Sequence, residues 1–197
     1  TYEEVFCECC GGERKIILSN YDRYGIFYKS NLCNDCGLIY TSPRFDQSSY
    51  INFYDSQYRK IYAKYPLIQT QKDFYEKQVN KGQKILNFIE KHHNSKKINS
   101  VLEVGCGMGG ILKPFKENGC EVLGVDFGSE YIDFGKSQDI SLKVGGINNI
   151  NGKFDLIIYS HVFEHILNLN DELHEIKKRL KPNGVLYIEV PGIFNLK

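Results

Sequence analysis

The sequence has no excess of charge of either sign. Its 25 Lys and Arg residues balance 24 Asp and Glu residues, which gives a formal net charge of +1. Proteins that bind nucleic acids usually concentrate positive charge, so this balance argues against a nucleic acid partner. No apolar run is long enough to cross a bilayer, so the sequence predicts no membrane partner either.

The N-terminus lacks the pattern of an export signal, because no basic segment followed by an apolar one opens the chain. An initiating Met is also missing, so we expect a few residues to precede Thr1. Repeats and low-complexity segments are absent. These features favour a cytoplasmic protein, and 197 residues suffice for one full domain plus a small module.

The cysteines are unevenly placed, with five of the seven in the first 36 residues. An odd number in a paired pattern fits metal binding better than a disulfide framework. Cys7 and Cys10, and then Cys33 and Cys36, form two CxxC pairs, each followed by a glycine. Four thiolates from two tight turns suit a tetrahedral structural zinc. We therefore predict a zinc-binding module over residues 1–45.

Residues 46–95 are expected to form a helical linker or lid. Tyrosines recur every four residues at Tyr50, Tyr54, Tyr58 and Tyr62, which is helical spacing. Packing is the simpler interpretation for most of them. A tyrosine hydroxyl can also bond a cofactor carboxylate or an acceptor, so we expect Tyr54 or Tyr58 to reach a cofactor pocket and assign Tyr58 as a candidate cofactor-binding residue. A second helix is predicted over about 70–91.

Residues 96–197 alternate strands and helices. Strands are predicted over 98–104, 121–126, 141–144, 154–160 and 185–190, helices over 111–117, 129–137 and 171–180, and a turn at 182–184. This alternation indicates right-handed βαβ units and a parallel sheet. The predicted fold is α/β: a Rossmann-like parallel sheet with flanking helices, preceded by a small zinc-ribbon-like module and a helical segment.

A glycine-rich loop, Gly105 to Gly110, follows the first of these strands. Its spacing fits both GxGxxG and GxGxG, so the loop alone does not separate NAD from S-adenosylmethionine. Glu103, at the strand's end, would repel a pyrophosphate but suits a ligand with an ammonium group and a sulfonium. Asp126 ends the next strand, where a carboxylate can accept hydrogen bonds from both ribose hydroxyls, and Phe127 is placed to lie against adenine.

Two later segments complete the pattern, FDLIIYSHVFEHI at 154–166 and LKPNGVLYIEVPG at 180–192. In order and spacing, residues 98–192 resemble the successive motifs of class I S-adenosylmethionine-dependent methyltransferases. The resemblance implies a methyltransferase with S-adenosylmethionine as cofactor. The implied cofactor residues in this region are Glu103, Gly105, Cys106, Gly107, Gly109, Asp126, Phe127, Asn148, Ser160 and His161.

The chain departs from that family in two places. Where the family often has an acidic residue near the adenine amino group, this chain reads VGGINN at 144–149, so backbone groups or Asn148 would make the contact. The family's sheet usually ends with two further strands in a hairpin. The sequence stops soon after the strand at 185–190, so we expect the domain to be truncated at its C-terminus.

Glu164 and His165 have three interpretations. His165 could be a general base that takes a proton from an acceptor hydroxyl. The pair could instead bind a divalent metal beside the acceptor, as in methyltransferases with a similar EH pair. It could also simply cap or orient the following helix, and the residues do not decide among these interpretations. We name both as candidate catalytic residues.

The N-terminal half has its own likeness. CxxCG followed by CxxCGLIYTSPR and tyrosine-rich helices resembles the zinc-binding domain that precedes some bacterial methyltransferases of sugars and surface polysaccharides. The likeness implies a sugar, nucleotide sugar or surface-polysaccharide precursor as acceptor, and a role in carbohydrate biosynthesis. The alternatives are methylation of RNA, tRNA or a quinone-like small molecule, an NAD-binding oxidoreductase, and a binding module without turnover. The oligomeric state is not encoded in any recognisable pattern.

Overall fold

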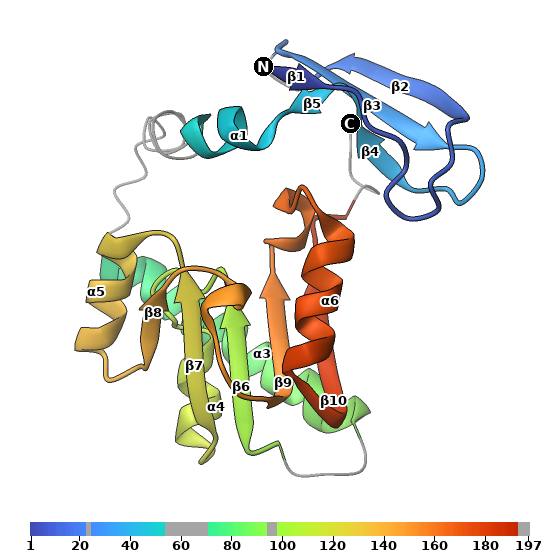
Figure 1. Ribbon diagram of the computed structural model, residues 1–197. Helices are drawn as coiled ribbons and strands as arrows, with labels where there is room; N and C mark the ends of the chain where they lie inside the picture. Colours follow the sequence, from blue (N-terminus) through green and yellow to red (C-terminus); the bar gives the residue numbers. More distant parts are fainter. Residues whose placement is uncertain (23–24, 54–70, 94–97, 193–197) are drawn as a thin grey trace. The chain divides into compact units, whose positions relative to one another are not determined.

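A computed structural model of the chain describes residues 1–22, 25–53, 71–93 and 98–192 (Figure 1). The chain divides into two compact units. The cysteine unit comprises residues 1–67 and 167–170, and the Rossmann unit comprises residues 68–166 and 171–197. Within the described ranges, no helix combines the length and the apolar character that a membrane crossing requires.

The cysteine unit is built on short antiparallel strands. Its sheet has the order β2 (Lys15–Tyr21), β3 (Phe27–Cys33) and β4 (Ile39–Thr41), and a second pair joins β1 (Tyr2–Glu3) to β5 (Arg44–Phe45). Helix α1 (Gln47–Phe53) follows. Both CxxC pairs lie beside these strands, because the first precedes β2 and the second spans the end of β3 and the turn to β4.

The Rossmann unit contains a five-stranded sheet in which every pair of neighbouring strands is parallel (Figure 1). The strands are β6 (Ser100–Val104), β7 (Glu121–Asp126), β8 (Leu142–Val144), β9 (Phe154–Ser160) and β10 (Leu180–Glu189), in the spatial order β10-β9-β6-β7-β8. The chain runs outward from β6 to β8 and then returns to β9 on the other side of β6. The predicted parallel α/β sheet is confirmed.

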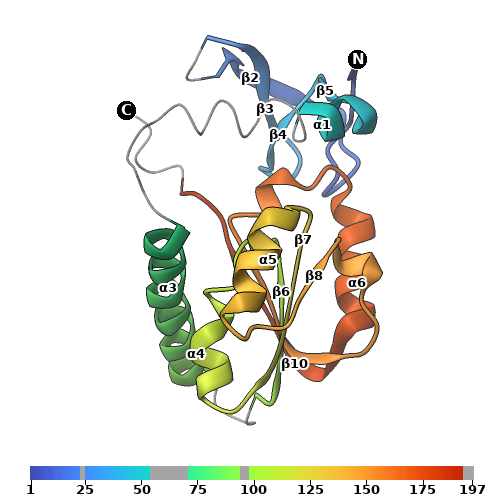
Figure 2. The same ribbon diagram turned by 90° about the vertical axis from the view of Figure 1, so that its left-hand side faces the viewer.

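Helices cover both faces of this sheet. Helices α3 (Gln71–His92) and α4 (Leu112–Glu117) lie on one face and α6 (Leu169–Arg179) on the other (Figure 2). Helix α5 (Ser129–Ser137) contributes Ile132 to the same apolar cluster as α3 and α4. Strand β9 serves both layers, since Ile158 belongs to that cluster and Ile157 to the one that includes Ile176 of α6. A strand buried on both faces accounts for the continuous apolar run in the sequence.

The structure differs from the prediction at the turn expected over 182–184 and agrees with it at the helix expected over 70–91. The expected turn at 182–184 lies inside the span of β10, where the pairing with β9 shifts register between Leu180 and Val185 and Asn183 has a φ of 62°. The predicted helix over 70–91 corresponds to α3, which buries Ile85 and Ile89 in the core of the Rossmann unit.

Of the tyrosines at helical spacing, only Tyr50 lies among the described residues, in α1. The others and the predicted helix end fall outside those residues: Tyr54, Tyr58, Tyr62 and Pro66. The lid hypothesis and the domain limits 1–45, 46–95 and 96–197 therefore stay predictions.

Candidate functional site at the carboxyl edge of the sheet

All five strands of the Rossmann unit end at one edge of the sheet, because they run parallel. The residues that follow β6, β7, β8 and β9 are therefore neighbours in space although they are far apart in sequence (Figure 1). In open parallel sheets, ligands bind beyond this carboxyl edge at the topological switch point, where the strand order reverses direction. Here that point lies at β6, which carries Glu103 and leads into the glycine loop.

The glycine loop folds back on the neighbouring strand. The backbone N–H groups of Gly105 and Cys106 donate to the carbonyl oxygen of Val125 at 2.8 and 3.0 Å. Positive φ, which residues with a side chain rarely adopt, occurs at three glycines of the loop: Gly105, Gly107 and Gly109. A Cβ at Gly105 would lie 2.3 Å from a methyl carbon of Val162, so the loop accepts no side chain there. The loop presents backbone to the site.

The predicted contact from Cys106 is restricted to its backbone. Its side chain is fully buried in the core on the α3 face, and this burial raises the pKa of its thiol. Gln78 of α3 supports the loop from outside, because its side-chain nitrogen donates to the Cys106 carbonyl at 3.4 Å and its oxygen accepts from Gly110 N–H at 3.3 Å.

Glu103 is a buried carboxyl group with an unpaired oxygen. The residue is 1% exposed, and its Oε2 has no hydrogen-bond partner among the described residues. Burial raises its pKa well above the ordinary range, Asp126 adds to this effect, and Lys81 opposes it. A carboxylate without a partner is costly in the interior, so the site fits a cationic group placed against Glu103. The ammonium of S-adenosylmethionine meets this requirement, and a pyrophosphate does not.

Asp126 joins the glycine loop to the next helix. Its Oδ2 accepts a hydrogen bond from Gly107 N–H at 2.8 Å, and its Oδ1 accepts one from Gly128 N–H at 2.7 Å. Each carboxylate oxygen has two lone pairs, so acceptor capacity is left for ribose hydroxyls. The fixed orientation suits the predicted ribose contact.

The expected adenine side combines Phe127 with the segment after β8. The Phe127 ring is 81% exposed, and a Cβ at Gly146 would lie 3.3 Å from its Cζ, so the ring stands beside the Gly146 backbone. Asn148 is exposed in the short helix η2 (Ile147–Asn149). The side chain of Asn149, not Asn148, accepts from Gly146 N–H at 3.0 Å and shapes this loop.

A cluster of imidazoles and carboxylates follows β9. Oε1 of Glu164 lies 3.8 Å from Nδ1 of His161 and 3.8 Å from Nε2 of His165. Glu164 and His165 belong to the helix η3 (Phe163–His165). Burial lowers the pKa of His165, although Glu164 opposes the shift, so the neutral imidazole is favoured. A neutral imidazole can accept a proton, and this matches the base interpretation of His165.

The mutual contacts of two charged residues of the site, Lys81 and Glu189, carried no sequence signal. Lys81 of α3 lies 3.2 Å from Oε1 of Glu189, which ends β10. Oε1 of Glu189 is also 3.3 Å from Nε2 of His161, and its Oε2 accepts from the Ser160 hydroxyl at 3.4 Å. Ser160 and His161 thus reach the predicted edge. Glu189 was visible in the motif LYIEVPG, but nothing there indicated its partners.

The four paired cysteines of the cysteine unit come together as predicted. Their sulfur atoms all lie within 4.8 Å of one another, with Cys7 to Cys36 at 3.5 Å and Cys10 to Cys33 at 3.6 Å. Tetrahedral zinc with bonds of about 2.3 Å separates its sulfurs by about 3.8 Å. Within the described ranges, no other group of three or more Cys, His, Asp or Glu side chains gathers closely enough to hold a metal ion.

The geometry of the two turns explains this convergence. Gly11 and Gly37, one after each CxxC, have φ of 72° and 79°. Gly11 N–H donates to the Cys7 carbonyl at 2.7 Å, and Gly37 N–H donates to the Cys33 carbonyl at 3.0 Å. The two turns are therefore equivalent, and both point their thiols inward. The sulfur set fits zinc in number, chemistry and spacing.

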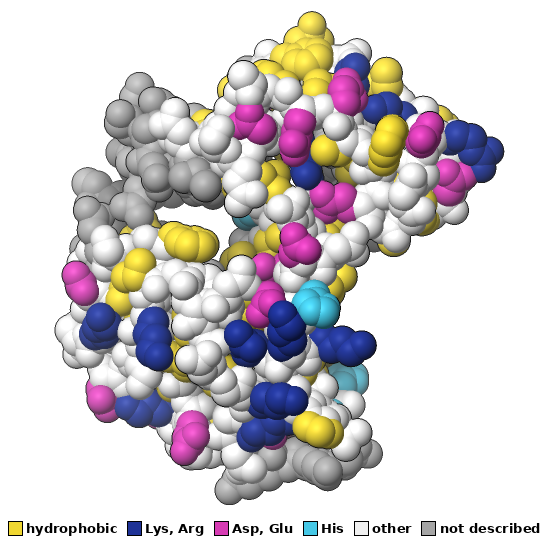
Figure 3. All heavy atoms as spheres, viewed as in Figure 1, with side chains coloured by type: hydrophobic (Ala, Val, Ile, Leu, Met, Phe, Trp, Pro, Cys, Tyr) yellow, Lys and Arg dark blue, Asp and Glu magenta, His cyan; other side chains and the backbone are white. Residues whose placement is uncertain are grey.

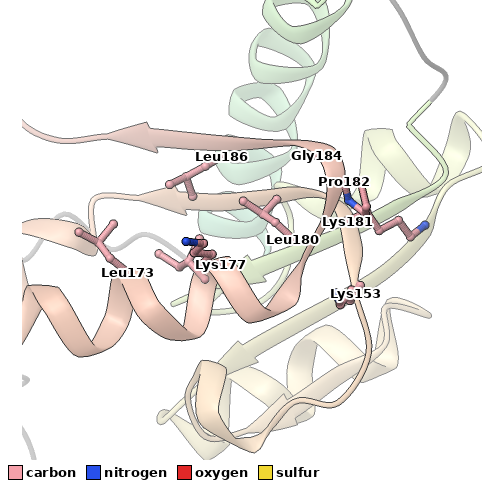
Figure 4. Close-up of a pocket in the computed structure, with 9 residues that line it drawn as sticks. Lys153, Leu173, Lys177, Leu180, Lys181, Pro182, Gly184 and Leu186 are labelled. Atoms are coloured by element: carbon pink, nitrogen blue, oxygen red, sulfur yellow. The ribbon is translucent and has the colours of Figure 1, made fainter.

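A pocket of about 480 Å³ lies in the Rossmann unit between α6 and β10 (Figure 4). Leu173 and Lys177 of α6, Leu180 and Leu186 of β10, and Lys153 before β9 line it. Lys and Arg side chains gather on this face of the Rossmann unit (Figure 3).

Comparisons with known proteins identify a methyltransferase domain in the chain. A family profile described as a methyltransferase domain matches residues 68–194. A ubiquinone biosynthesis O-methyltransferase of Bartonella tribocorum is 30% identical over 97 residues, covering 45% of this chain and 39% of that protein. A malonyl-[acyl-carrier protein] O-methyltransferase of Enterobacter lignolyticus is 30% identical over 91 residues, covering 44% and 36%.

Among solved structures, Streptomyces venezuelae DesVI aligns with a TM-score of 0.50 at 17% identity, over 78% of this chain and 61% of that chain. This likeness concerns the fold. The chain spans well under half the length of the two curated relatives named above. The family profile covers most of the chain, and the matched region holds the parallel sheet, the glycine loop and the two acidic residues at the strand ends. The chain therefore belongs to the methyltransferase-domain family, with the Rossmann-like fold of the class I, S-adenosylmethionine-dependent type.

Proposed function

We propose that this protein transfers a methyl group from S-adenosylmethionine to a small-molecule acceptor at the carboxyl edge of the Rossmann unit. The observation that carries the proposal is Glu103, a buried carboxyl group with an unpaired oxygen directly before a loop of positive-φ glycines. When bound, S-adenosylmethionine supplies an electrophilic methyl group on its sulfonium. The chain supplies orientation, because methyl transfer needs chiefly an aligned nucleophile.

Each residue of the site then has a role. Glu103 holds the ammonium, the glycine loop lies along the methionine portion, and Asp126 accepts from the ribose. Phe127 and the backbone near Gly146 hold the adenine, with Asn148 in reach of its edge. Ser160 and His161 border the cofactor where the acceptor approaches. His165, neutral and beside Glu164, takes the acceptor's proton.

We propose a sugar, nucleotide sugar or surface-polysaccharide precursor as acceptor. The support is the likeness of residues 7–62 to the zinc-binding domain of bacterial sugar methyltransferases. The cysteine unit would hold one structural zinc through Cys7, Cys10, Cys33 and Cys36. A quinone-like phenol is the second candidate, because several curated relatives are named ubiquinone biosynthesis O-methyltransferases.

The experiment is a methyl-transfer screen with the full chain and labelled S-adenosylmethionine. Nucleotide sugars, catechol-type phenols and tRNA serve as acceptors, and heat-denatured protein provides the background. Label in a nucleotide sugar supports the proposal, and label in a phenol favours the second candidate. Label that enters only tRNA, or no label above the background in any class, would overturn the assignment of a small-molecule acceptor from these classes.

A further inference from the structure

Glu189 connects three elements at the carboxyl edge. Its Oε1 lies 3.2 Å from Nζ of Lys81 on α3 and 3.3 Å from Nε2 of His161 after β9. Its Oε2 accepts hydrogen bonds from the hydroxyls of Tyr187 at 3.2 Å and Ser160 at 3.4 Å. The carboxylate at the end of β10 is therefore held by contacts on both oxygens.

The backbone of His161 is held by the same residue. Its N–H donates to the carbonyl oxygen of Glu189 at 2.8 Å, and its φ is 57°. Left-handed backbone is unfavourable for a residue with a side chain, and it persists only where the surroundings determine it. Glu189 therefore contacts His161 twice, once through the main chain and once through the ring.

The two nitrogens of the His161 ring have different surroundings. Nε2 lies at 3.3 Å from Oε1 of Glu189, whereas Nδ1 lies at 3.8 Å from Oε1 of Glu164, which is too long for a hydrogen bond. A carboxylate accepts and does not donate, so its negative charge attracts an N–H at the nearer ring nitrogen and repels a lone pair there. The short contact at Nε2 therefore favours the proton on that nitrogen. The other nitrogen then presents a lone pair.

We propose that Glu189 is a positioning residue that fixes the tautomer of His161, with the proton on Nε2 and the lone pair on Nδ1. The His161 side chain is 47% exposed, so the ring is not sealed in the core. The lone pair accepts a hydrogen bond from an O–H or N–H group next to the acceptor's nucleophilic atom, while His165 takes the proton of that atom itself. This role rests on the proposed function, and it restricts the acceptor to a compound with a second donor beside the reacting atom, such as a vicinal diol, a catechol or an amino alcohol.

The test is the imidazole tautomer, measured by long-range ¹H–¹⁵N correlation on ¹⁵N-labelled full chain at alkaline pH, where imidazoles are neutral. His161→Gln assigns the signals. We expect His161 to be protonated on Nε2 in the unsubstituted protein. Protonation on Nδ1, or a rapidly averaged mixture of both tautomers, would overturn the proposal without any variant being needed.

Two substitutions then separate Glu189 from its surroundings. Glu189→Gln keeps an acceptor oxygen for His161 and should retain the tautomer, whereas Glu189→Met removes it and should give a mixture. Glu175→Met is the control, because Glu175 pairs with Lys178 on α6 and has no part in the site. An unchanged tautomer in folded Glu189→Met protein would refute the role of Glu189.

The readout is independent of methyl transfer, because it is made without cofactor or acceptor. Binding of S-adenosylhomocysteine to the same samples tests the proposed function separately. If the protein has a fixed Nε2–H tautomer but does not bind S-adenosylhomocysteine, the contact between Glu189 and His161 stands. The proposed methyl transfer, and with it the role of His161 toward an acceptor, is then wrong. The two failures are therefore distinguishable.

Discussion

The Asp126 carboxylate is hydrogen-bonded to the glycine loop by way of Gly107, whose N–H lies 2.8 Å from Oδ2. One residue thereby closes the loop after β6 onto the end of β7. The same carboxylate is the predicted partner of the ribose hydroxyls. Loss of Asp126 should consequently affect both the ligand contact and the shape of the loop.

Asp126→Ala should weaken binding of S-adenosylhomocysteine by about 1–3 kcal/mol, roughly 5- to 150-fold. This is the usual cost of losing a hydrogen bond to a charged group and leaving its donor partners unpaired. Isothermal calorimetry measures this change. Asp133→Ala removes the same charge from an exposed position on α5 and should leave the affinity unchanged. Equal affinity in Asp126→Ala and the unsubstituted protein would remove Asp126 from the site.

Gly105→Ala tests whether the loop needs its glycine. Gly105 has a φ of 69°, and its added Cβ would lie 2.3 Å from a Val162 methyl carbon. Gly119 has a similar φ of 85° but open space around it. Gly119→Ala should lose about 1–2 kcal/mol of unfolding free energy through backbone strain, and Gly105→Ala should lose more. Urea unfolding compares the two.

A third variant separates the clash from the strain in that experiment. Gly105→Ala combined with Val162→Ala removes the methyl group that the new Cβ would meet. The pair should therefore be less destabilised than the sum of the single variants. Equal unfolding free energies for Gly105→Ala and Gly119→Ala would contradict the close approach in the structure.

The cysteine unit should bind one zinc per chain. Cys36→Ser should lower the zinc content measured by elemental analysis, because it removes one of four converging sulfurs. Cys9→Ser is the matched control, since Cys9 sits between two of the ligands yet lies outside the group. Zinc-free protein after purification without chelators, or equal loss in both variants, would speak against the four-cysteine site.

Glu103 predicts opposite pH trends for ligand affinity and for stability. Its pKa is raised in the folded protein, and an ammonium ligand needs the ionised form. Below that raised pKa, binding of S-adenosylhomocysteine must release a proton, so affinity should fall with decreasing pH, by up to about tenfold per pH unit. The ligand-free protein should instead lose stability as the pH rises toward the same pKa, because ionising the buried carboxyl is unfavourable.

Glu103→Gln removes both effects. The variant should bind S-adenosylhomocysteine more weakly and with little dependence on pH, and its stability should not decline as the pH rises through the range in which Glu103 ionises. Calorimetry and urea unfolding at several pH values provide the two readouts. An unchanged pH profile of affinity in Glu103→Gln would mean that Glu103 does not face the ammonium.

Local patterns predicted most of the Rossmann unit. The strands at 121–126 and 154–160 and the helix at 129–137 have the expected limits, because apolar runs and glycine turns define them locally. β10 was harder, since its early residues around Pro182 pair irregularly with β9. That irregularity depends on the neighbouring strand, so no periodic pattern in the sequence of β10 indicates it.

The candidate site was predictable only where it follows a motif. Glu103 and Asp126 stand at strand ends, and the sequence places them without tertiary information. Lys81 lies in a long, charged helix, and its meeting with Glu189 depends on how α3 packs on the sheet. Such contacts connect residues far apart in the chain. The buried side chain of Cys106 is a further case, since a loop position does not reveal which way a side chain turns.

Calorimetric titration of the full chain with S-adenosylhomocysteine and, separately, with NAD tests the assignment of the cofactor. We expect saturable binding of S-adenosylhomocysteine at one site per chain and no binding of NAD, because Glu103 attracts an ammonium and repels a pyrophosphate. Saturable binding of NAD together with no binding of S-adenosylhomocysteine would contradict this assignment.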